Sequence, residues 1–383
     1  MPMDEYTLAE IFRQMELELI TSMRRTLSKH EKWEDELGYS WEQWQLSKIR
    51  SIEQFRADNQ AIIASYNSDI QNTIDTILKQ SYGEAYNNSI KLADGIYLDI
   101  AGMDNSVDLG LAEIPEDNFF QINDKRLNAV INEMQSDFGY ANNWITGRMD
   151  NRYRDILAKS VIKLNAGETS VTSAIDEASD DFLKKGIDCV VYKDGKRVNI
   201  ASYAEMYLRT SAQRARLVAD GAVRNRMKVY TVNSSQHLTA CPICLKWQAR
   251  PLVDNVFTNI PVHEALTLSL KLSYPLLTEA MHEGFLHPNC RHTLYTFFPG
   301  KSTETKPLTK DQSLDALDKY NVEQEQRKLE NEVRRWKRIK EGSIAKDKKA
   351  YASKKVSANQ KLLLEHVKAN PNLRREYWRE RLR

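Results

Sequence analysis

The chain has 383 residues, of which 41% are apolar, 28% are charged and only four are cysteine. This length and apolar content favour two or more domains with substantial cores, and four cysteines are too few for a disulfide scaffold. The sequence contains neither an apolar run of transmembrane length nor a secretory leader, so we expect a protein made in the cytosol without a membrane partner.

The net charge of +2 hides an uneven distribution. Residues 327–383 hold 19 Lys and Arg against 7 Asp and Glu, whereas the preceding 326 residues carry 36 basic and 46 acidic groups. A basic tail on an acidic body predicts a partner for the tail, which is either DNA bound without sequence preference or an acidic protein surface. A merely solvated helix face is the alternative.

Residues 1–186 are predicted to form a mainly helical domain, because proline and glycine are sparse there. Apolar residues recur at helical spacing over residues 7–34 and again over 41–80. The second run predicts either one helix about 60 Å long or a kinked pair, with an apolar face that needs a partner. Residues 95–120 are rich in Gly, Asp and Asn and are expected to form a loop. Further helices are predicted at 124–138, 140–164 and 169–185.

Residues 187–305 are predicted to form a compact α+β module. β-branched residues on both sides of Asp194-Gly195 predict a hairpin, and a helix is expected from Ser202 to about Asp220. Strands are predicted at 228–232 and 293–298, and a helix at 263–282 with a break at Pro275. The predicted fold class is therefore α+β, with a long-helix N-terminal domain.

Residues 306–383 are predicted to form a charged helical tail. The linker before it, residues 301–312, consists largely of Ser, Thr, Lys and Pro. One helix is expected at 314–341, followed by a Lys-rich break at 346–355 and a helical end beyond Pro371.

Three of the four cysteines and most of the histidines gather in one stretch of the chain. It opens with Cys241-Pro-Ile-Cys244 and closes with His287-Pro-Asn-Cys290-Arg-His292. Thiolates and imidazoles joined by two-residue spacers are typical of tetrahedral zinc sites. The sequence predicts a structural zinc bound by Cys241, Cys244, His287 and Cys290, with His292 competing with His287.

Two other interpretations of these cysteines stay open: they are buried small hydrophobes, or they form a disulfide, which a reducing cytosol disfavours. A catalytic zinc is less expected, because it needs an open coordination position and a nearby general base. His263 and His282 each begin the H-E-x-x-H pattern, but neither is followed by the second histidine. Outside the ligand set, we expect Trp247 and Gln248 to be buried core groups and His237 to be a structural histidine.

The residues around the two Cys/His turns resemble the tailed-phage minor capsid protein 2 family and, more distantly, the Mu F-like head-morphogenesis proteins. In that family a Ser-x-His strand leads to a Cys-containing segment, then to Trp-Gln, and later to His-Pro-x-Cys-Arg-His. The matching residues are Ser235, His237, Cys244, Trp247, Gln248, His287, Pro288, Cys290, Arg291 and His292. Ala249 stands where a glycine usually follows Trp-Gln.

The resemblance implies a structural virion protein of low copy number, located inside the head at the portal vertex. Such proteins aid procapsid assembly, bind the portal and other head proteins, and in some phages leave with the DNA. The helical N-terminus would then contact the portal, and the basic tail would contact packaged DNA.

The alternative function is a metal-dependent hydrolase or nuclease, or a toxin-like transferase, of phage origin. The sequence argues against an enzyme, because it contains no P-loop, G-x-S-x-G or H-E-x-x-H motif. A DNA-binding regulator is a third possibility, which no helix-turn-helix or regular zinc-finger spacing supports.

Overall fold

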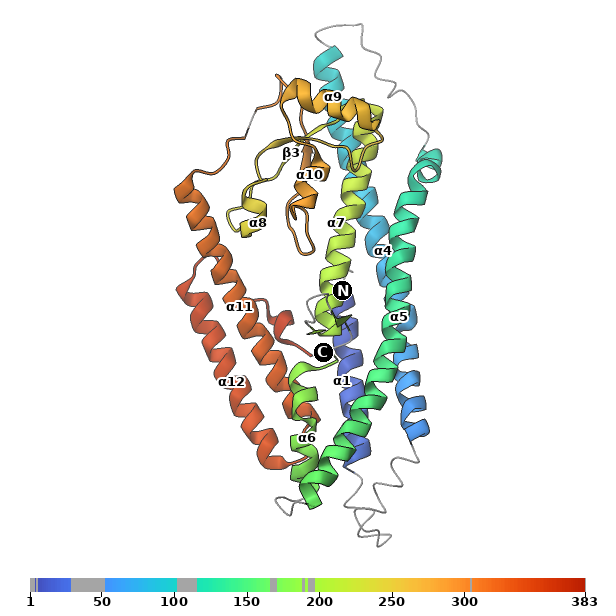
Figure 1. The fold of residues 1–383 in the computed structure, drawn as a ribbon, viewed down its shortest axis with the longest axis vertical. Helices are drawn as coiled ribbons and strands as arrows, with labels where there is room; N and C mark the ends of the chain where they lie inside the picture. Colours follow the sequence, from blue (N-terminus) through green and yellow to red (C-terminus); the bar gives the residue numbers. More distant parts are fainter. Residues whose placement is uncertain are drawn as a thin grey trace. The chain divides into compact units, whose positions relative to one another are not determined.

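A computed structural model of the chain describes residues 4, 6–28, 52–101, 116–165, 171–187, 190–191, 197–303 and 305–382 (Figure 1). The elements follow in the order α1 (Thr7–Leu27), α4 (Ile52–Ala101), α5 (Glu116–Asn165), α6 (Val171–Lys185), β1 (Val190–Val191), β2 (Arg197–Val198), α7 (Ile200–Arg226), β3 (Thr231–Ser234), α8 (Pro242–Leu245), β4 (Pro251–Val253), α9 (Val262–Leu272), α10 (Leu277–His282), β5 (Leu294–Thr296), α11 (Lys310–Gly342), α12 (Lys346–Ala369) and the 3-10 helix η1 (Tyr377–Glu380). Long helices with a small antiparallel sheet agree with the predicted α+β class. Among the described helices, none is long and apolar enough to cross a bilayer.

The chain forms two compact units, and each is assembled from segments that are distant in sequence. The first unit contains Met1–Glu5, Thr73–Gln135 and Met206–Asn321, and the second contains Tyr6–Asn72, Ser136–Glu205 and Val322–Arg383. Several long helices contribute to both units. The three-part division into residues 1–186, 187–305 and 306–383 stays a prediction.

The core of the second unit is formed by apolar faces of helices. Phe12 of α1 is fully buried, with its ring centroid 5.1 Å from that of Phe138 on α5. Phe55 of α4 stacks on Tyr153 of α5 at 4.4 Å. The apolar face predicted for residues 41–80 is therefore largely buried within the chain from Ile52 onward, and its earlier part lies outside the described residues.

Helix α6 ends where the sequence predicts, at Gly186. The φ of Gly186 is +70°, a left-handed conformation that favours glycine. A Cβ atom at this position would also clash with the carboxylate of Glu16, which accepts a hydrogen bond from the Ile187 amide at 2.7 Å. Glycine is thus required both to end the helix and to admit Glu16.

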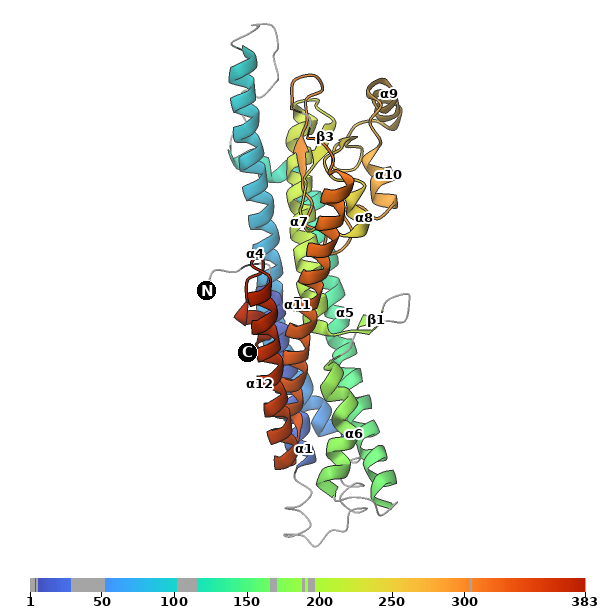
Figure 2. The same cartoon turned by 90° about the vertical axis from the view of Figure 1, so that its left-hand side faces the viewer.

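Helices α11 and α12 form an antiparallel pair within the second unit (Figure 2). The rings of Trp336 and Tyr351 meet edge to face at 5.7 Å. Towards the other end of the pair, Nε2 of His366 lies 3.0 Å from the carbonyl oxygen of Val322. From Val322 onward the tail is therefore packed structure that belongs to the second unit.

The predicted break at 346–355 is wrong, because this stretch is the start of α12. The chain turns earlier, at residues 343–345. There the two carboxylate oxygens of Asp176 accept the backbone amides of Ile344 and Ala345 at 2.7 and 2.8 Å. Asp176 therefore fixes the turn that immediately precedes α12, whose N-cap residue is Ala345.

The predicted loop at 95–120 is too long. Residues 95–101 continue α4 and residues 116–120 begin α5, and the residues between them lie outside the described part. The helices predicted at 124–138 and 140–164 are one helix. By contrast, the hairpin prediction is confirmed, since Val190 pairs with Val198 in antiparallel register.

The first unit contains a three-stranded antiparallel sheet in the order β4-β3-β5. The central strand β3 is buried along its length, and its Val232 pairs with Leu252 on one side and Thr296 on the other. The strand predicted at 293–298 contains β5, the one predicted at 228–232 begins three residues before β3, and β4 was not predicted. Figure 1 shows α8, α9 and α10 gathered around this sheet, with α9 and α10 separated near the predicted break at Pro275.

Helix α7 packs closely against the turn that follows β4. A Cβ atom on Gly221 would collide with the backbone of Phe257, so only glycine allows this approach. Leu217 of α7 shares one apolar core with Val232, Trp247, Leu252, Leu277 and Phe285. This core includes Cys244 and Cys290, so it supports both Cys/His turns.

Candidate metal centre

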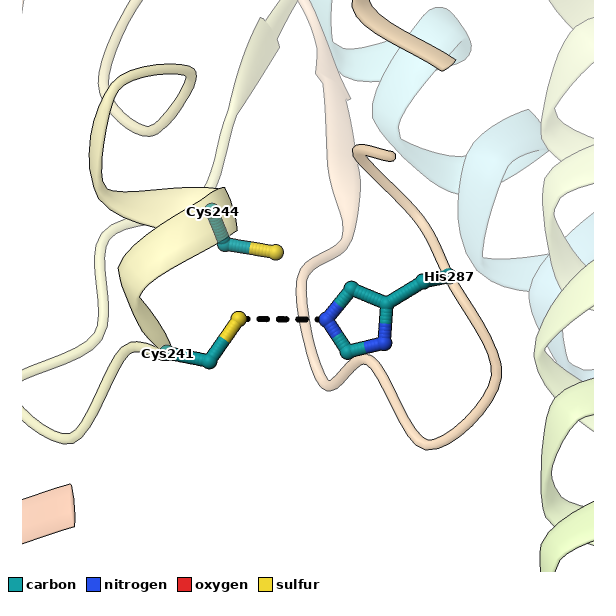
Figure 3. Close-up of side chains that lie close together, drawn as sticks. All are labelled: Cys241, Cys244 and His287. Atoms are coloured by element: carbon teal, nitrogen blue, oxygen red, sulfur yellow. Dashed lines mark hydrogen bonds between the residues drawn. The ribbon is translucent and has the colours of Figure 1, made fainter. Parts of the chain in front are cut away.

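The first Cys/His turn is the short helix α8. Cys241 is its N-cap residue with an extended backbone, and Pro242 occupies the first helical position, where the missing N–H costs nothing. The carbonyl of Cys241 accepts the amide of Cys244 at 3.1 Å. This turn brings the side chains of Cys241 and Cys244 to the same side of the helix, as Figure 3 shows.

The second turn lies between α10 and β5. Leu286 and Asn289 have φ values of 55° and 66°, and these left-handed residues fold the chain around His287. The carbonyl of His287 accepts the amide of Cys290 at 2.8 Å. The turn is tied to α7, because the Asn289 amide donates to Thr210 Oγ1 at 3.3 Å. Both two-residue spacers therefore make the same local hydrogen bond.

The two turns bring all five predicted metal donors together. Cys241 Sγ lies 3.1 Å from His287 Nε2 (Figure 3), Cys244 Sγ lies 3.6 Å from Cys290 Sγ, and Cys290 Sγ lies 3.4 Å from His292 Nδ1. The donors form two triads that share Cys244, one completed by Cys241 and His287 and the other by Cys290 and His292. Within each triad all donor atoms lie within 4.8 Å of one another.

In His287 and His292, the ring nitrogen that does not contact a sulfur atom lies against an oxygen acceptor. Nδ1 of His287 lies 2.7 Å from the carbonyl oxygen of Pro288, so this nitrogen carries the proton. Nε2 of His292 lies 3.2 Å from Gln248 Oε1, which must be the amide oxygen because it also accepts the backbone N–H of His237 at 3.0 Å. Outer hydrogen bonds of this kind orient the histidine ligands of metal sites.

The residues that the sequence analysis expected to be structural lie next to the cluster. Trp247 and Gln248 are buried, which confirms their prediction as core residues. His237 lies outside both triads, with Nε2 3.0 Å from Ser235 Oγ and 3.0 Å from the Arg291 carbonyl oxygen. These contacts are those of a structural histidine, and burial lowers its pKa.

The thiols of the cluster have strongly shifted pKa values. The hydrogen bond with Cys244 lowers the pKa of Cys290 to about 4, against the opposing effect of burial, and His292 adds to the decrease. The same hydrogen bond, together with burial, raises the pKa of Cys244. Ionisation is therefore favoured at Cys290 over Cys244.

Cys241 and His287 also have shifted pKa values. Burial opposes ionisation of Cys241, but hydrogen bonds from the Cys244 backbone and from His287 outweigh it and lower the pKa of Cys241. Burial also opposes protonation of His287, but Cys241 outweighs this effect and raises the histidine pKa. Each of the two residues therefore favours the charged form of the other.

The arrangement differs from that of a hydrolytic metal site. Among the described residues, neither triad contains a carboxylate that could act as a general base. The two histidines that begin the H-E-x-x-H pattern, His263 and His282, lie on α9 and α10 with exposed side chains and do not join the cluster. The chemistry available to the cluster is that of soft, tetrahedral metal ligation.

Several details of the site could not be read from the sequence. Gln248 was expected to be buried, but nothing in the sequence showed that its oxygen orients His292. Gln213 of α7 was missed altogether, although its side-chain amide donates to the His292 carbonyl. Its signal would have been a polar residue on the buried side of an amphipathic helix.

Comparison with known proteins places the chain among phage structural proteins. The model of the family described as Phage minor capsid protein 2 matches residues 5–368. A curated relative described as a structural protein, from Lactococcus phage LL-H, is 25% identical over 236 residues, which are 60% of this chain and 61% of the relative. The match thus spans about three fifths of the relative's length. No solved structure is significantly similar to the chain. Since the family model covers nearly the whole sequence, the chain belongs to the phage minor capsid protein 2 family.

Proposed function

We propose that the protein is a non-enzymatic, low-copy component of the phage head that sits inside the capsid at the portal vertex and aids procapsid assembly. The observation that carries this proposal is the family match over residues 5–368, and the description of the Lactococcus phage relative as a structural protein agrees with it. The helical second unit is the part proposed to dock on the portal, with other head proteins as further partners.

An exposed aromatic pair on α5 is the proposed docking surface. The side chains of Tyr140 and Trp144 are 71% and 49% exposed, and their spacing of four residues places them on one helix face. Arg148, one turn further on, lies over the Trp144 ring at 5.0 Å. Aromatic and arginine side chains dominate the energetics of protein interfaces, so a face of this composition suits a protein partner.

This surface replaces the one that the sequence suggested. The apolar face of α4 was expected to meet another chain, but its described residues are largely buried in this one. Deleting the N-terminal helices would not test docking either, because α1 contributes fully buried residues such as Phe12 and Met15 to the core. The test therefore needs substitutions at the surface.

Coexpression with the portal protein of the same genome would test the docking proposal. Tyr140→Ser together with Trp144→Ser should weaken co-purification at least tenfold, because truncating interface aromatics commonly costs about 2 kcal/mol or more. Tyr295→Ser is the control, since Tyr295 is a tyrosine on β5 of the first unit that is 60% exposed. Equal retention of the portal by both variants would refute docking through this face.

A second proposed contact is with packaged DNA through α12. Many tail cations are engaged within the chain: Arg338 donates to two backbone carbonyls, Lys348 pairs with Asp180, and Arg375 pairs with Glu380. However, Lys354, Lys361 and Lys368 are exposed at seven-residue spacing, so they line one side of α12. Lys361 also pairs with Glu365 at 3.9 Å, but its side chain is 78% exposed. A row of exposed lysines on one helix face suits a phosphate backbone.

A further inference from the structure

We infer that the protein binds one zinc ion per chain, held by Cys241, Cys244, His287 and Cys290. The site has a structural role and is independent of the proposed docking on the portal. Its basis is the convergence of the two Cys/His turns in the first unit, where the donor atoms form two triads that share Cys244.

The spacings between donor atoms are those of a tetrahedral metal site. With Zn–S bonds of about 2.3 Å and Zn–N bonds of about 2.0 Å, two sulfurs lie about 3.8 Å apart, and a sulfur and a nitrogen about 3.5 Å apart. The observed separations are 3.6 Å for Cys244 and Cys290 and 3.1 Å for Cys241 and His287. These two edges connect the first turn to the second. Because Cys290 does not share a triad with Cys241 or His287, zinc binding would have to draw Cys290 Sγ towards them to complete the tetrahedron.

The same distances do not describe a disulfide. Two bonded sulfur atoms lie about 2.05 Å apart, whereas Cys244 Sγ and Cys290 Sγ are separated by 3.6 Å. Simple burial of hydrophobic cysteines does not account for the cluster either, because two hydrogen-bonded histidines face the sulfur atoms. Buried polar groups brought together in this way need a ligand or a proton to balance them.

The matching turns favour His287 over His292 as the nitrogen ligand. His287 and Cys290 are separated by two residues and joined by the same carbonyl-to-amide hydrogen bond as Cys241 and Cys244. His287 is also the only one of the two histidines that shares a triad with Cys241. His292 is 3% exposed and is fixed by Gln248 behind Cys290, where it supports the ligand without binding the metal.

Zinc binding would proceed with loss of protons. Cys241, Cys244 and Cys290 would bind zinc as thiolates and His287 would bind through Nε2, while its Nδ1–H stays hydrogen-bonded to the Pro288 carbonyl, so zinc affinity should fall as the pH falls. Three thiolates and one neutral imidazole then fill all four positions. A closed set of protein ligands leaves no position for substrate or water, which is the pattern of structural zinc.

The metal would connect elements that are distant in sequence. Residues 245–286, including β4, α9 and α10, lie between the two turns. The zinc would therefore join α8 to the loop before β5 and fix the edge strand β5 against β3. The expected consequence is a first unit whose thermal stability depends on zinc.

The experiment uses full-length protein purified under reducing conditions without chelator. Metal analysis should give one zinc per chain, and cobalt exchanged for zinc should give the intense visible bands of tetrahedral cobalt with thiolate charge-transfer bands. Wild-type protein without stoichiometric zinc after incubation with the metal, and with all thiols reacting equally fast, would overturn the proposal. This measurement does not depend on the folding of any variant.

Variants then identify the ligands. Cys290→Ser and His287→Ala should weaken zinc binding at least tenfold in competition with a chromogenic chelator, whereas Cys189→Ser, which removes the remaining cysteine, should keep wild-type affinity. His292→Ala should retain one zinc per chain. If His292→Ala instead abolishes binding and His287→Ala does not, the assignment of the nitrogen ligand is overturned.

Discussion

Arg224 and Asp254 form an ion pair that is completely removed from solvent. Arg224 Nη2 lies 2.7 Å from Asp254 Oδ2, and the two side chains are 1% and 0% exposed. The other carboxylate oxygen accepts the amides of Val256 and Phe257 at 3.2 and 2.8 Å. Asp254 therefore shapes the turn after β4 while it anchors that turn to α7, next to the core that supports the Cys/His cluster.

Breaking this pair from the arginine side should strongly destabilise the first unit. Arg224→Met would leave a buried carboxylate without its cation, which typically costs about 3–5 kcal/mol. Arg214→Met, on the exposed side of the same helix, is the control and should change stability by less than about 0.5 kcal/mol. Urea unfolding followed by circular dichroism measures both variants. Equal midpoints for the two would show that the pair contributes little.

We predict that replacing Ala249, the residue after Trp247-Gln248, with glycine stabilises the protein. Ala249 has a φ of 55°, although it carries a side chain, and its amide donates to the Ser234 carbonyl at 3.2 Å. A left-handed conformation costs a non-glycine residue about 1–2 kcal/mol, which explains why the resemblance places glycine at this position. Ala249→Gly should therefore raise the free energy of unfolding by about 1 kcal/mol.

The control for Ala249→Gly is a second Ala→Gly substitution that should lower the free energy of unfolding. Ala350 is exposed on α12, so Ala350→Gly should lower stability by about 1 kcal/mol through helix propensity alone. Thermal unfolding of both variants beside the wild type distinguishes the local backbone effect from a general effect of added glycine. A lower melting temperature for Ala249→Gly would contradict the interpretation.

The sequence predicted the elements whose boundaries are set locally. The end of α6 at Gly186 and the break near Pro275 depend on the backbone of a single residue, so they could be read directly. The start of α12 depends instead on Asp176, which is far away in sequence. Strand β4 has only three residues, too few for an alternating pattern, and exists because it pairs with β3.

The sequence likewise predicted only part of the candidate site. Two-residue spacing was sufficient to group Cys241 with Cys244, which share a triad, whereas His287 and Cys290 lie in different triads despite the same spacing. Spacing could not show where His292 lies, since its ring is held by Gln248 from another part of the chain. The tail was predicted as basic and helical, but its packing into the second unit depends on tertiary contacts that charge does not reveal.

Because of Glu380, the second unit should become less stable at acidic pH. Burial alone would raise the pKa of Glu380, but hydrogen bonds from Arg375 and Gln360 outweigh it, and the charge of Lys337 helps to hold the pKa below its ordinary value of 4.5. Because the folded pKa is depressed, this stabilisation is present above the unfolded pKa and is lost as the pH falls through the folded pKa. The free energy of unfolding should therefore decline below about pH 4.5.

The substitution Glu380→Gln isolates this contribution. The variant should be less stable than the wild type at pH 7, and the difference should shrink as the pH approaches 3, where the wild-type carboxyl takes up its proton. Glu365→Gln on the exposed side of α12 is the control and should follow the wild-type curve. A constant difference between Glu380→Gln and the wild type across this range would show that the charge of Glu380 is not the stabilising feature.

The lysine row on α12 predicts how binding to DNA depends on salt. Lys361 has a side chain that is 78% exposed, and Lys354 and Lys368 flank it on the same helix side. If each lysine neutralises one phosphate, replacing all three with glutamine should reduce the slope of log affinity against log salt by about 2.7. The matched control replaces Lys301, Lys306 and Lys310, three exposed lysines outside α12, and should leave the slope unchanged. Fluorescence anisotropy with a labelled duplex of arbitrary sequence measures both. Because the tail's arginines are largely engaged in the second unit, an unchanged slope in the α12 variant would remove the structural basis for a DNA contact by the tail.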